Sequence, residues 1–209
     1  LALAMSVGVS SRLRFGGAVL RLILSGLAVS AFFSALVSML KFGADPLSTL
    51  PEITYWLLGG LSGASWQRLM LAAPVAVLSV GVLVMLRWRV TLLSLDEATA
   101  TSLGARPAVE RTLVLAMAAA GVAAVTALSG VVGWVGLIVP HLARLALPGD
   151  EGSTIPGAAL YGAMFVLLAD ALSRGLFPAE LPLGVTTSLL GTVVFLGLIA
   201  SRRMSVERG

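Results

Sequence analysis

The ionisable side chains that could do chemistry are few, and they lie singly or in pairs at the ends of apolar runs. The single histidine, His141, has no carboxylate or second histidine at ligand spacing, and the chain has no cysteine. Its only lysine is Lys41, and no Gly-x-x-x-x-Gly-Lys-Ser/Thr motif for ATP is present. We therefore interpret His141 as a polar helix end, and we expect no catalytic residue, metal site or cofactor on this chain.

Asp170 and Arg174 are one helical turn apart and have opposite charge. The simplest interpretation is an ion pair at a helix end. An ion-driven carrier usually needs an ionisable residue deep in the membrane. Asp170 is the nearest candidate, because the other acidic residues lie in loops or near the ends of apolar runs. If the protein moves a substrate, we expect the energy to come from another chain.

The composition is that of a membrane protein: 58% of the 209 residues are hydrophobic and 11% are charged. A bilayer core needs roughly 20 apolar residues per helix. Runs without charge that approach or exceed this length are Leu22 to Leu40, Leu69 to Leu86, Thr112 to Pro140, Gly152 to Ala169 and Leu181 to Ser201. We expect an all-α bundle of membrane helices. The net charge of +4 indicates membrane orientation and not nucleic-acid binding, because the basic residues flank the apolar runs.

The basic residues also predict the topology. Arg12, Arg14 and Arg21 place the start of the first complete span in the cytoplasm. If Thr112 to Arg144 crosses twice, eleven of the fourteen basic residues lie inside. This segment is too short for two full helices, so one of them must be short or broken. The apolar start, Leu1 to Ser11, is expected to belong to an earlier helix and not to a signal peptide.

The break is expected where three glycines recur at a spacing of three, at Gly130, Gly133 and Gly136, shortly before Pro140. Irregular backbone at membrane depth survives only if protein covers it or if it lines an aqueous cavity. We interpret this stretch as a hinge or a junction, buried in a bundle or beside a pathway.

Small side chains form a stripe along the first complete span. Gly26, Ser30, Ser34 and Ser38 recur at every fourth residue, which places them on one helix face. Two interpretations stay open: close packing against another helix, or the wall of a polar path.

Two connecting segments also have patterns of their own. Ile53 to Leu61 is apolar but too short to span, which indicates a surface or re-entrant helix ended by Gly59 and Gly60. Ser94 to Pro107 is the only sizeable hydrophilic segment within the chain, and Asp96 and Glu97 suit a helix N-terminus. It is either a solvated loop or a docking site for another protein.

Three ordered stretches, Ser129–Arg144, Leu167–Arg174 and Glu180–Gly191, resemble the C-terminal signature of the FecCD family. Leu22–Gly26 and Ile53–Gly59 also fit, so the resemblance covers nearly the whole chain. The family comprises permease subunits of ABC importers for iron-siderophores, haem, cobalamin and related metal chelates. The resemblance implies a membrane helix bundle of the vitamin B12 importer type. This chain would hold about six spans plus part of a seventh and lack the N-terminal third.

The resemblance also implies roles for particular residues. A coupling segment at about 92–110 would rest on the ATP-binding subunit through Asp96, Glu97, Ala98, Leu103 and Gly104. Arg174 would pair with a glutamate of the substrate-binding protein. Ala18, Val19 and Leu20 would form the inner gate, and the face with Gly26, Ser30, Ser34 and Ser38 would line the pathway.

We therefore expect residues 1–209 to form one transmembrane domain, a permease subunit of the bacterial cytoplasmic (inner) membrane. It would move an iron chelate or a related metal chelate or cobalamin inward while a separate chain hydrolyses ATP. The expected partners are an ATP-binding cassette subunit, a periplasmic or lipid-anchored binding protein, a second permease copy and membrane lipid, but no nucleic acid. Two alternatives stay open, an ion-coupled carrier in which Asp170 titrates and a membrane remnant without transport activity. No residue identifies the chelate.

Overall fold

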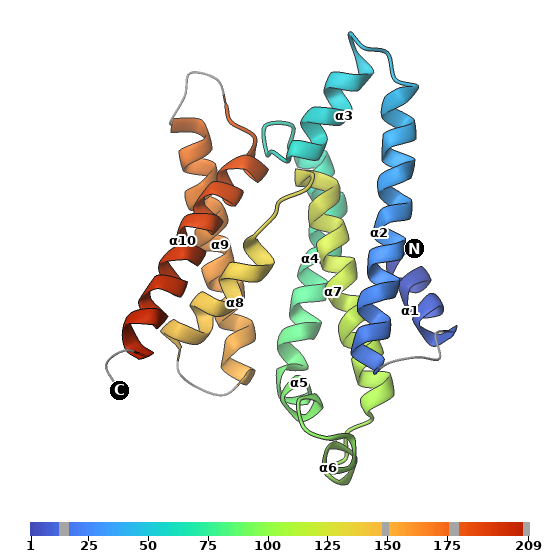
Figure 1. The fold of residues 1–209 in the computed structure, drawn as a ribbon, viewed down its shortest axis with the longest axis vertical. Helices are drawn as coiled ribbons and strands as arrows, with labels where there is room; N and C mark the ends of the chain where they lie inside the picture. Colours follow the sequence, from blue (N-terminus) through green and yellow to red (C-terminus); the bar gives the residue numbers. More distant parts are fainter. Residues whose placement is uncertain (13–16, 148–150, 176–179, 207–209) are drawn as a thin grey trace. The chain divides into compact units, whose positions relative to one another are not determined.

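The computed structural model describes residues 1–12, 17–147, 151–175 and 180–206, and helices make up most of these ranges (Figure 1). Side chains at 18–19, 151–153 and 201–206 lie outside the described part. The chain forms two compact units, Leu1–Thr54 and Tyr55–Gly209, and each is described by itself. The prediction of a single domain stays a prediction.

The helices follow one another with short connections. They are α1 (Ala2–Arg12), α2 (Ala18–Phe42), α3 (Thr49–Leu58), α4 (Trp66–Met85), α5 (Arg87–Leu93), α6 (Glu97–Ser102), α7 (Pro107–Ser129), α8 (Val135–Ala146), α9 (Glu151–Gly175) and α10 (Leu183–Val206). The all-α prediction is confirmed.

In the first unit, α1 packs against α2 through small polar side chains. The hydroxyl groups of Ser6 and Ser25 lie 3.0 Å apart and are buried, and Ser25 also donates to the carbonyl of Leu22. A Cβ added at Gly26 would lie 3.9 Å from Ser6 Oγ, so Gly26 lies at the edge of the same contact. Small residues let two membrane helices approach closely, and the hydroxyl pair satisfies the groups that this approach buries.

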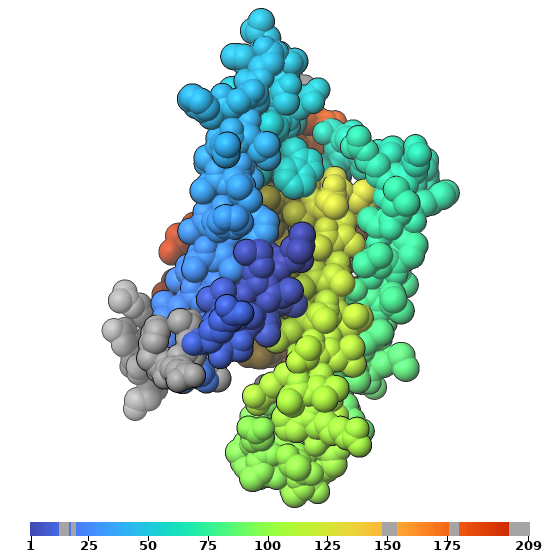
Figure 2. Space-filling model, turned by 90° about the vertical axis from the view of Figure 1, so that its right-hand side faces the viewer, coloured from blue at the N-terminus to red at the C-terminus, as the bar shows by residue number. Residues whose placement is uncertain are grey.

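In the second unit, α4 and α7 lie side by side (Figures 1 and 2). Ser79 of α4 is buried, and a Cβ added at Gly121 of α7 would lie 3.1 Å from Ser79 Cβ. This pair again allows close approach of the backbones. Beyond the α5 end of the pair, the α5–α6 segment projects as a small lobe (Figure 2).

The remaining helices of the second unit, α8, α9 and α10, pack together around an apolar cluster. Its buried members are Ile138 and Val139 of α8 and Phe165 of α9. Trp134 meets Phe195 of α10 edge to face, with ring centroids 6.0 Å apart. An edge-to-face pair at this distance adds to the apolar contact.

Among the described residues, five helices are long and apolar enough to cross a membrane: Leu20–Phe42, Trp66–Met85, Pro107–Ser129, Thr154–Gly175 and Leu183–Ala200. Large apolar side chains are exposed along all of them, as expected where lipid replaces water. The segment Thr112 to Arg144, which is predicted to cross twice, contains most of one full helix, α7, and one short helix, α8, of 12 residues. At 1.5 Å per residue α8 is roughly 18 Å long, which is too short to cross alone.

Candidate docking and coupling sites

The helix break lies between α7 and α8. Gly130 has a positive φ of 67°, and Trp134, directly before α8, has the same value and is left-handed. A positive φ is uncommon for a residue other than glycine, and Trp134 is held there by its packing. The break is thus confirmed at Gly130 and Gly133, whereas Gly136 and Pro140 lie inside α8. Their role in a moving hinge stays a prediction.

Three glycines, Gly59, Gly130 and Gly184, meet where α3, α7 and α10 end or begin, and we call them the glycine junction. A Cβ at Gly59 would lie 2.5 Å from the carbonyl oxygen of Val131, and a Cβ at Gly130 or Gly184 would overlap the carbonyl of Trp56 or Leu58. All these obstacles are backbone atoms, which cannot turn aside as a side chain can. The junction therefore depends on glycine at each position.

Backbone hydrogen bonds hold the glycine junction together. The N–H of Gly60 donates to Ser129 at 2.8 Å, and the N–H of Leu183 donates to Gly59 at 2.9 Å. These bonds satisfy backbone groups that helix ends leave without partners. Beside the junction lies an open, largely apolar groove of about 470 Å³, lined by Leu57, Leu58, Val131, Gly133, Gly184, Val185, Ser188, Leu189 and Thr192.

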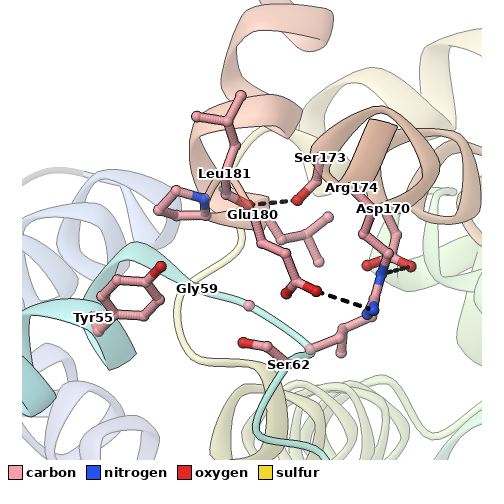
Figure 3. A pocket seen from close by; sticks show the side chains of 12 residues that line it. Tyr55, Gly59, Ser62, Asp170, Ser173, Arg174, Glu180 and Leu181 are labelled. Atoms are coloured by element: carbon pink, nitrogen blue, oxygen red, sulfur yellow. Dashed lines mark hydrogen bonds and ion pairs between the residues drawn. The ribbon is translucent and has the colours of Figure 1, made fainter. Parts of the chain in front are cut away.

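Arg174 lies at the end of α9 that faces the junction (Figure 3). Its Nε donates to Asp170 Oδ2 at 3.0 Å, and its Nη1 lies 3.6 Å from Glu180 Oε1. The ion pair predicted between Asp170 and Arg174 is confirmed. The arginine side chain is 46% exposed, so both ion pairs are weak and a partner can reach the guanidinium.

Hydrogen bonds between Ser173 and Leu181 fix the chain on either side of Arg174 and Glu180. Ser173 donates its hydroxyl to the carbonyl of Leu181, and the N–H of Leu181 donates back to Ser173 at 3.1 Å. This reciprocal pair ties the start of α10 to the end of α9. A small pocket opens here between Tyr55, Gly59, Ser62, Arg174 and Glu180 (Figure 3).

At the opposite end of α7 lies the predicted coupling segment, which forms the short helix α6. Asp96 caps α6 by accepting the N–H of Thr99 at 3.0 Å. The pKa of the Asp96 carboxyl lies below its ordinary value because the side chain and then the N–H of Thr99 donate to it. Within this segment the chain from Glu97 to Ser102 is helical. A solvated connection and a docking site for another protein both stay predictions.

The α6 segment has a buried and an exposed side. Ala100 and Ala105 are 1% and 4% exposed, so they form the side that rests on the protein. The predicted contact residues are exposed: Asp96, Glu97, Ala98, Leu103 and Gly104. Leu103, 56% exposed at the end of α6, is an apolar side chain available to a partner's groove.

Arg89 of α5 links the end of α6 to the start of α7. Its Nη1 donates to the carbonyl of Gly104 at 3.1 Å and to Glu110 Oε1 at 3.2 Å. This arrangement could not be predicted from the sequence, because residues 15 and 21 positions apart share no local pattern. Trp134 and the junction partners Gly59 and Gly184 as a group could not be predicted for the same reason.

The predicted pathway residues lie in the first unit. Ser30, Ser34 and Ser38 are exposed on α2, and Ser38 donates to the carbonyl of Ser34 at 2.9 Å. Because these three serines are exposed in the first unit, their face is accessible to a pathway or a partner. In the predicted inner gate, Leu20 is exposed, and the side chains of Ala18 and Val19 lie outside the described residues.

These features define a multi-pass helical membrane protein with short and broken helices between polar segments at its two ends. Its residues 1–201 match the FecCD transport family, and the chain belongs to that family. The predicted resemblance is confirmed, and with it the multi-pass membrane localisation of the inner-membrane type.

Individual relatives agree with this assignment. The chain is 41% identical over 176 residues to a molybdate import system permease protein of Haemophilus influenzae, covering 84% of this chain and 52% of that protein. It is 38% identical over 204 residues to a hemin transport system permease protein of Yersinia pestis, covering 96% and 60%.

A solved structure has the same fold. A chain of an inward-facing, putative metal-chelate type ABC transporter matches with a TM-score of 0.88 and 38% identity, covering 95% of this chain and 63% of that chain. The chain thus spans between half and two thirds of the lengths of these relatives.

Proposed function

We propose that this chain is part of a permease subunit of an ATP-driven importer. A binding protein delivers a metal chelate at the Arg174 end, and ATP hydrolysis by a separate subunit drives the chelate into the cytoplasm. The observation that carries the proposal is the placement of an accessible arginine and an exposed coupling helix at opposite ends of the same unit. The separating helix α7 has 23 residues, roughly 34 Å at 1.5 Å per residue, which matches a bilayer core of about 30 Å.

The chemistry of the two ends supports different partners. A guanidinium presents a planar fork of N–H donors that suits a carboxylate, so Arg174 fits an acidic residue of a binding protein. The α6 end presents Leu103 beside the carboxylates of Asp96 and Glu97, which suits a groove with an apolar floor and a basic rim. A second permease copy would complete the pathway. The face of α2 that carries Ser30, Ser34 and Ser38, called the serine face, would be turned toward that copy.

The substrate class comes from the relatives. Their names include permeases for iron chelates, hemin, ferric dicitrate, vitamin B12 and molybdate. We propose an iron chelate or a related metal chelate such as cobalamin. The serine hydroxyls of α2 are expected to hold the substrate only weakly, since conduction needs release as well as entry.

The test of docking compares two charge reversals in the full-length protein with its binding protein and its ATPase. Arg174→Glu is expected to lower binding-protein affinity by at least about tenfold, since it replaces attraction by like-charge repulsion at the interface. The control is Arg68→Glu at the start of α4, whose guanidinium donates only to the carbonyl of Gly63 in the described structure. Equal affinities for the two variants would refute the docking role.

The ion-coupled alternative assigns proton coupling to Asp170, whose Oδ2 accepts a hydrogen bond from Arg174 Nε at 3.0 Å. Uptake that stops when a protonophore is added while ATP is present would establish the carrier and refute the proposal.

A further inference from the structure

The coupling helix α6 is held to the rest of the protein by few groups. Its buried side is made of alanine methyl groups, Ala100 within the helix and Ala105 just after it. Methyl groups bury little surface and fix no direction. In the described residues, both side-chain hydrogen bonds that lead from α5 to the α6–α7 segment come from Arg89.

The two acceptors of Arg89 are placed where they fix the direction of α6. Gly104 lies just after the C-terminal end of α6 and has a positive φ of 82°, so it makes the turn toward α7. Glu110 lies in the first turn of α7. One nitrogen, Nη1, therefore ties the end of the coupling helix and the start of a membrane span to α5 at the same point.

Glu110 depends on Arg89 for compensation of its charge. Its side chain is only 16% exposed, and its second carboxylate oxygen, Oε2, is buried without a hydrogen-bond partner among the described residues. A partly buried carboxylate without a cation is costly. The pair thus disfavours positions of α5 that would carry Arg89 away from Glu110.

We propose that Arg89 is a positioning residue that makes α5, α6 and the start of α7 move as one body. A push on the exposed side of α6 is then transmitted to α7. Because α5 also packs against α9, the same movement reaches the helix whose far end carries Arg174. This inference rests on the proposed function for its purpose. The contact of Arg89 with Gly104 and Glu110, called the clamp, can be tested without any partner.

The first experiment measures the geometry of the clamp in the full-length protein. Because this chain has no cysteine, spin labels are attached to cysteines introduced at the exposed positions Ser102 of α6 and Val122 of α7, after any cysteine elsewhere in the protein is replaced. Double electron–electron resonance gives the distribution of distances between the labels. We expect a narrow distribution with Arg89, a broad one in Arg89→Gln, and a narrow one in Arg89→Lys, which keeps a charged donor.

Arg87→Gln is the matched control, because Arg87 lies on the same short helix and is exposed. A distribution in Arg89→Gln as narrow as in Arg87→Gln would overturn the clamp. Glu110→Gln should broaden the distribution less than Arg89→Gln, since the bond to Gly104 remains.

The second experiment measures coupling in proteoliposomes that contain the complete importer. We expect Arg89→Gln to bind the ATPase and hydrolyse ATP, but to transport at least about tenfold fewer substrate molecules per ATP, since the loss of a charged hydrogen bond is worth about that factor. Arg89→Lys should recover most of the ratio. An unchanged number of substrate molecules per ATP in Arg89→Gln would overturn the inference. If the wild-type complex does not couple uptake to ATP, the proposed function is overturned, and the distance measurement still tests the clamp.

Discussion

Replacing Gly184 by alanine tests whether the glycine junction is as tight as the structure shows. The added Cβ would overlap the carbonyl oxygen of Leu58 and would lie 2.8 Å from that of Val131. Both obstacles are backbone atoms, so the start of α10 must shift. Overpacking of this kind costs about 1–3 kcal/mol, and weakening of the bond from Leu183 to Gly59 adds about 1 kcal/mol.

A small gain opposes this loss. Alanine is a better helix former than glycine by roughly 0.5–1 kcal/mol, which leaves a net destabilisation of about 2 kcal/mol. Gly197→Ala in the same helix is the matched control, because nothing lies within 4 Å of an added Cβ there. That variant should be neutral or slightly stabilised.

The assay is thermal unfolding of the full-length protein in detergent, followed by fluorescence-detected size-exclusion chromatography. We expect Gly184→Ala to melt roughly 5 °C below the wild type, and Gly197→Ala to melt at or slightly above the wild-type temperature. Equal melting temperatures for the two variants would refute the close approach of α10 to the ends of α3 and α7.

Two further predictions concern the coupling helix and the serine face. The hydrogen bonds from Thr99 lower the pKa of Asp96 in the folded state, so the cap is intact above the unfolded pKa of about 3.9 and is lost as the pH falls through the lower folded pKa. The exchange rate of the Thr99 amide hydrogen, after correction for the intrinsic rate, should rise in acid as the cap opens. The control is Asp96→Asn, which still caps the helix but does not titrate, so the corrected rate should not depend on pH. Ser34→Trp should abolish uptake without lowering stability, since Ser34 is exposed. The control, Leu36→Trp, lies on another face of α2 and should transport normally. Equal uptake by the two variants would contradict the pathway role of the serine face.

The sequence was sufficient to predict the membrane spans because a span needs only a long uncharged run. It also predicted the break between α7 and α8, since the charge bias favoured two crossings and the length allowed only one full helix. The position was right at Gly130 and Gly133, but Gly136 lies inside α8, which begins at Val135. Three glycines at equal spacing do not reveal which of them has a positive φ.

The contacts between distant segments could not be predicted in this way. Gly59, Gly130 and Gly184 meet only because three helix ends converge, and each glycine alone suggests an ordinary turn or helix packing. Arg89 resembles any basic residue after a membrane span until the fold brings Gly104 and Glu110 to it. Asp170 and Arg174 were predictable, because one helical turn separates them and pairs at this spacing meet on one face.

The most direct test of the central claim is uptake by proteoliposomes that hold the full-length protein with its ATPase, supplied with binding protein and a radiolabelled iron chelate. ATP sealed inside should drive accumulation that persists when a protonophore collapses the proton gradient and stops when a non-hydrolysable ATP analogue replaces ATP. Accumulation that follows the proton gradient and ignores ATP would contradict the account.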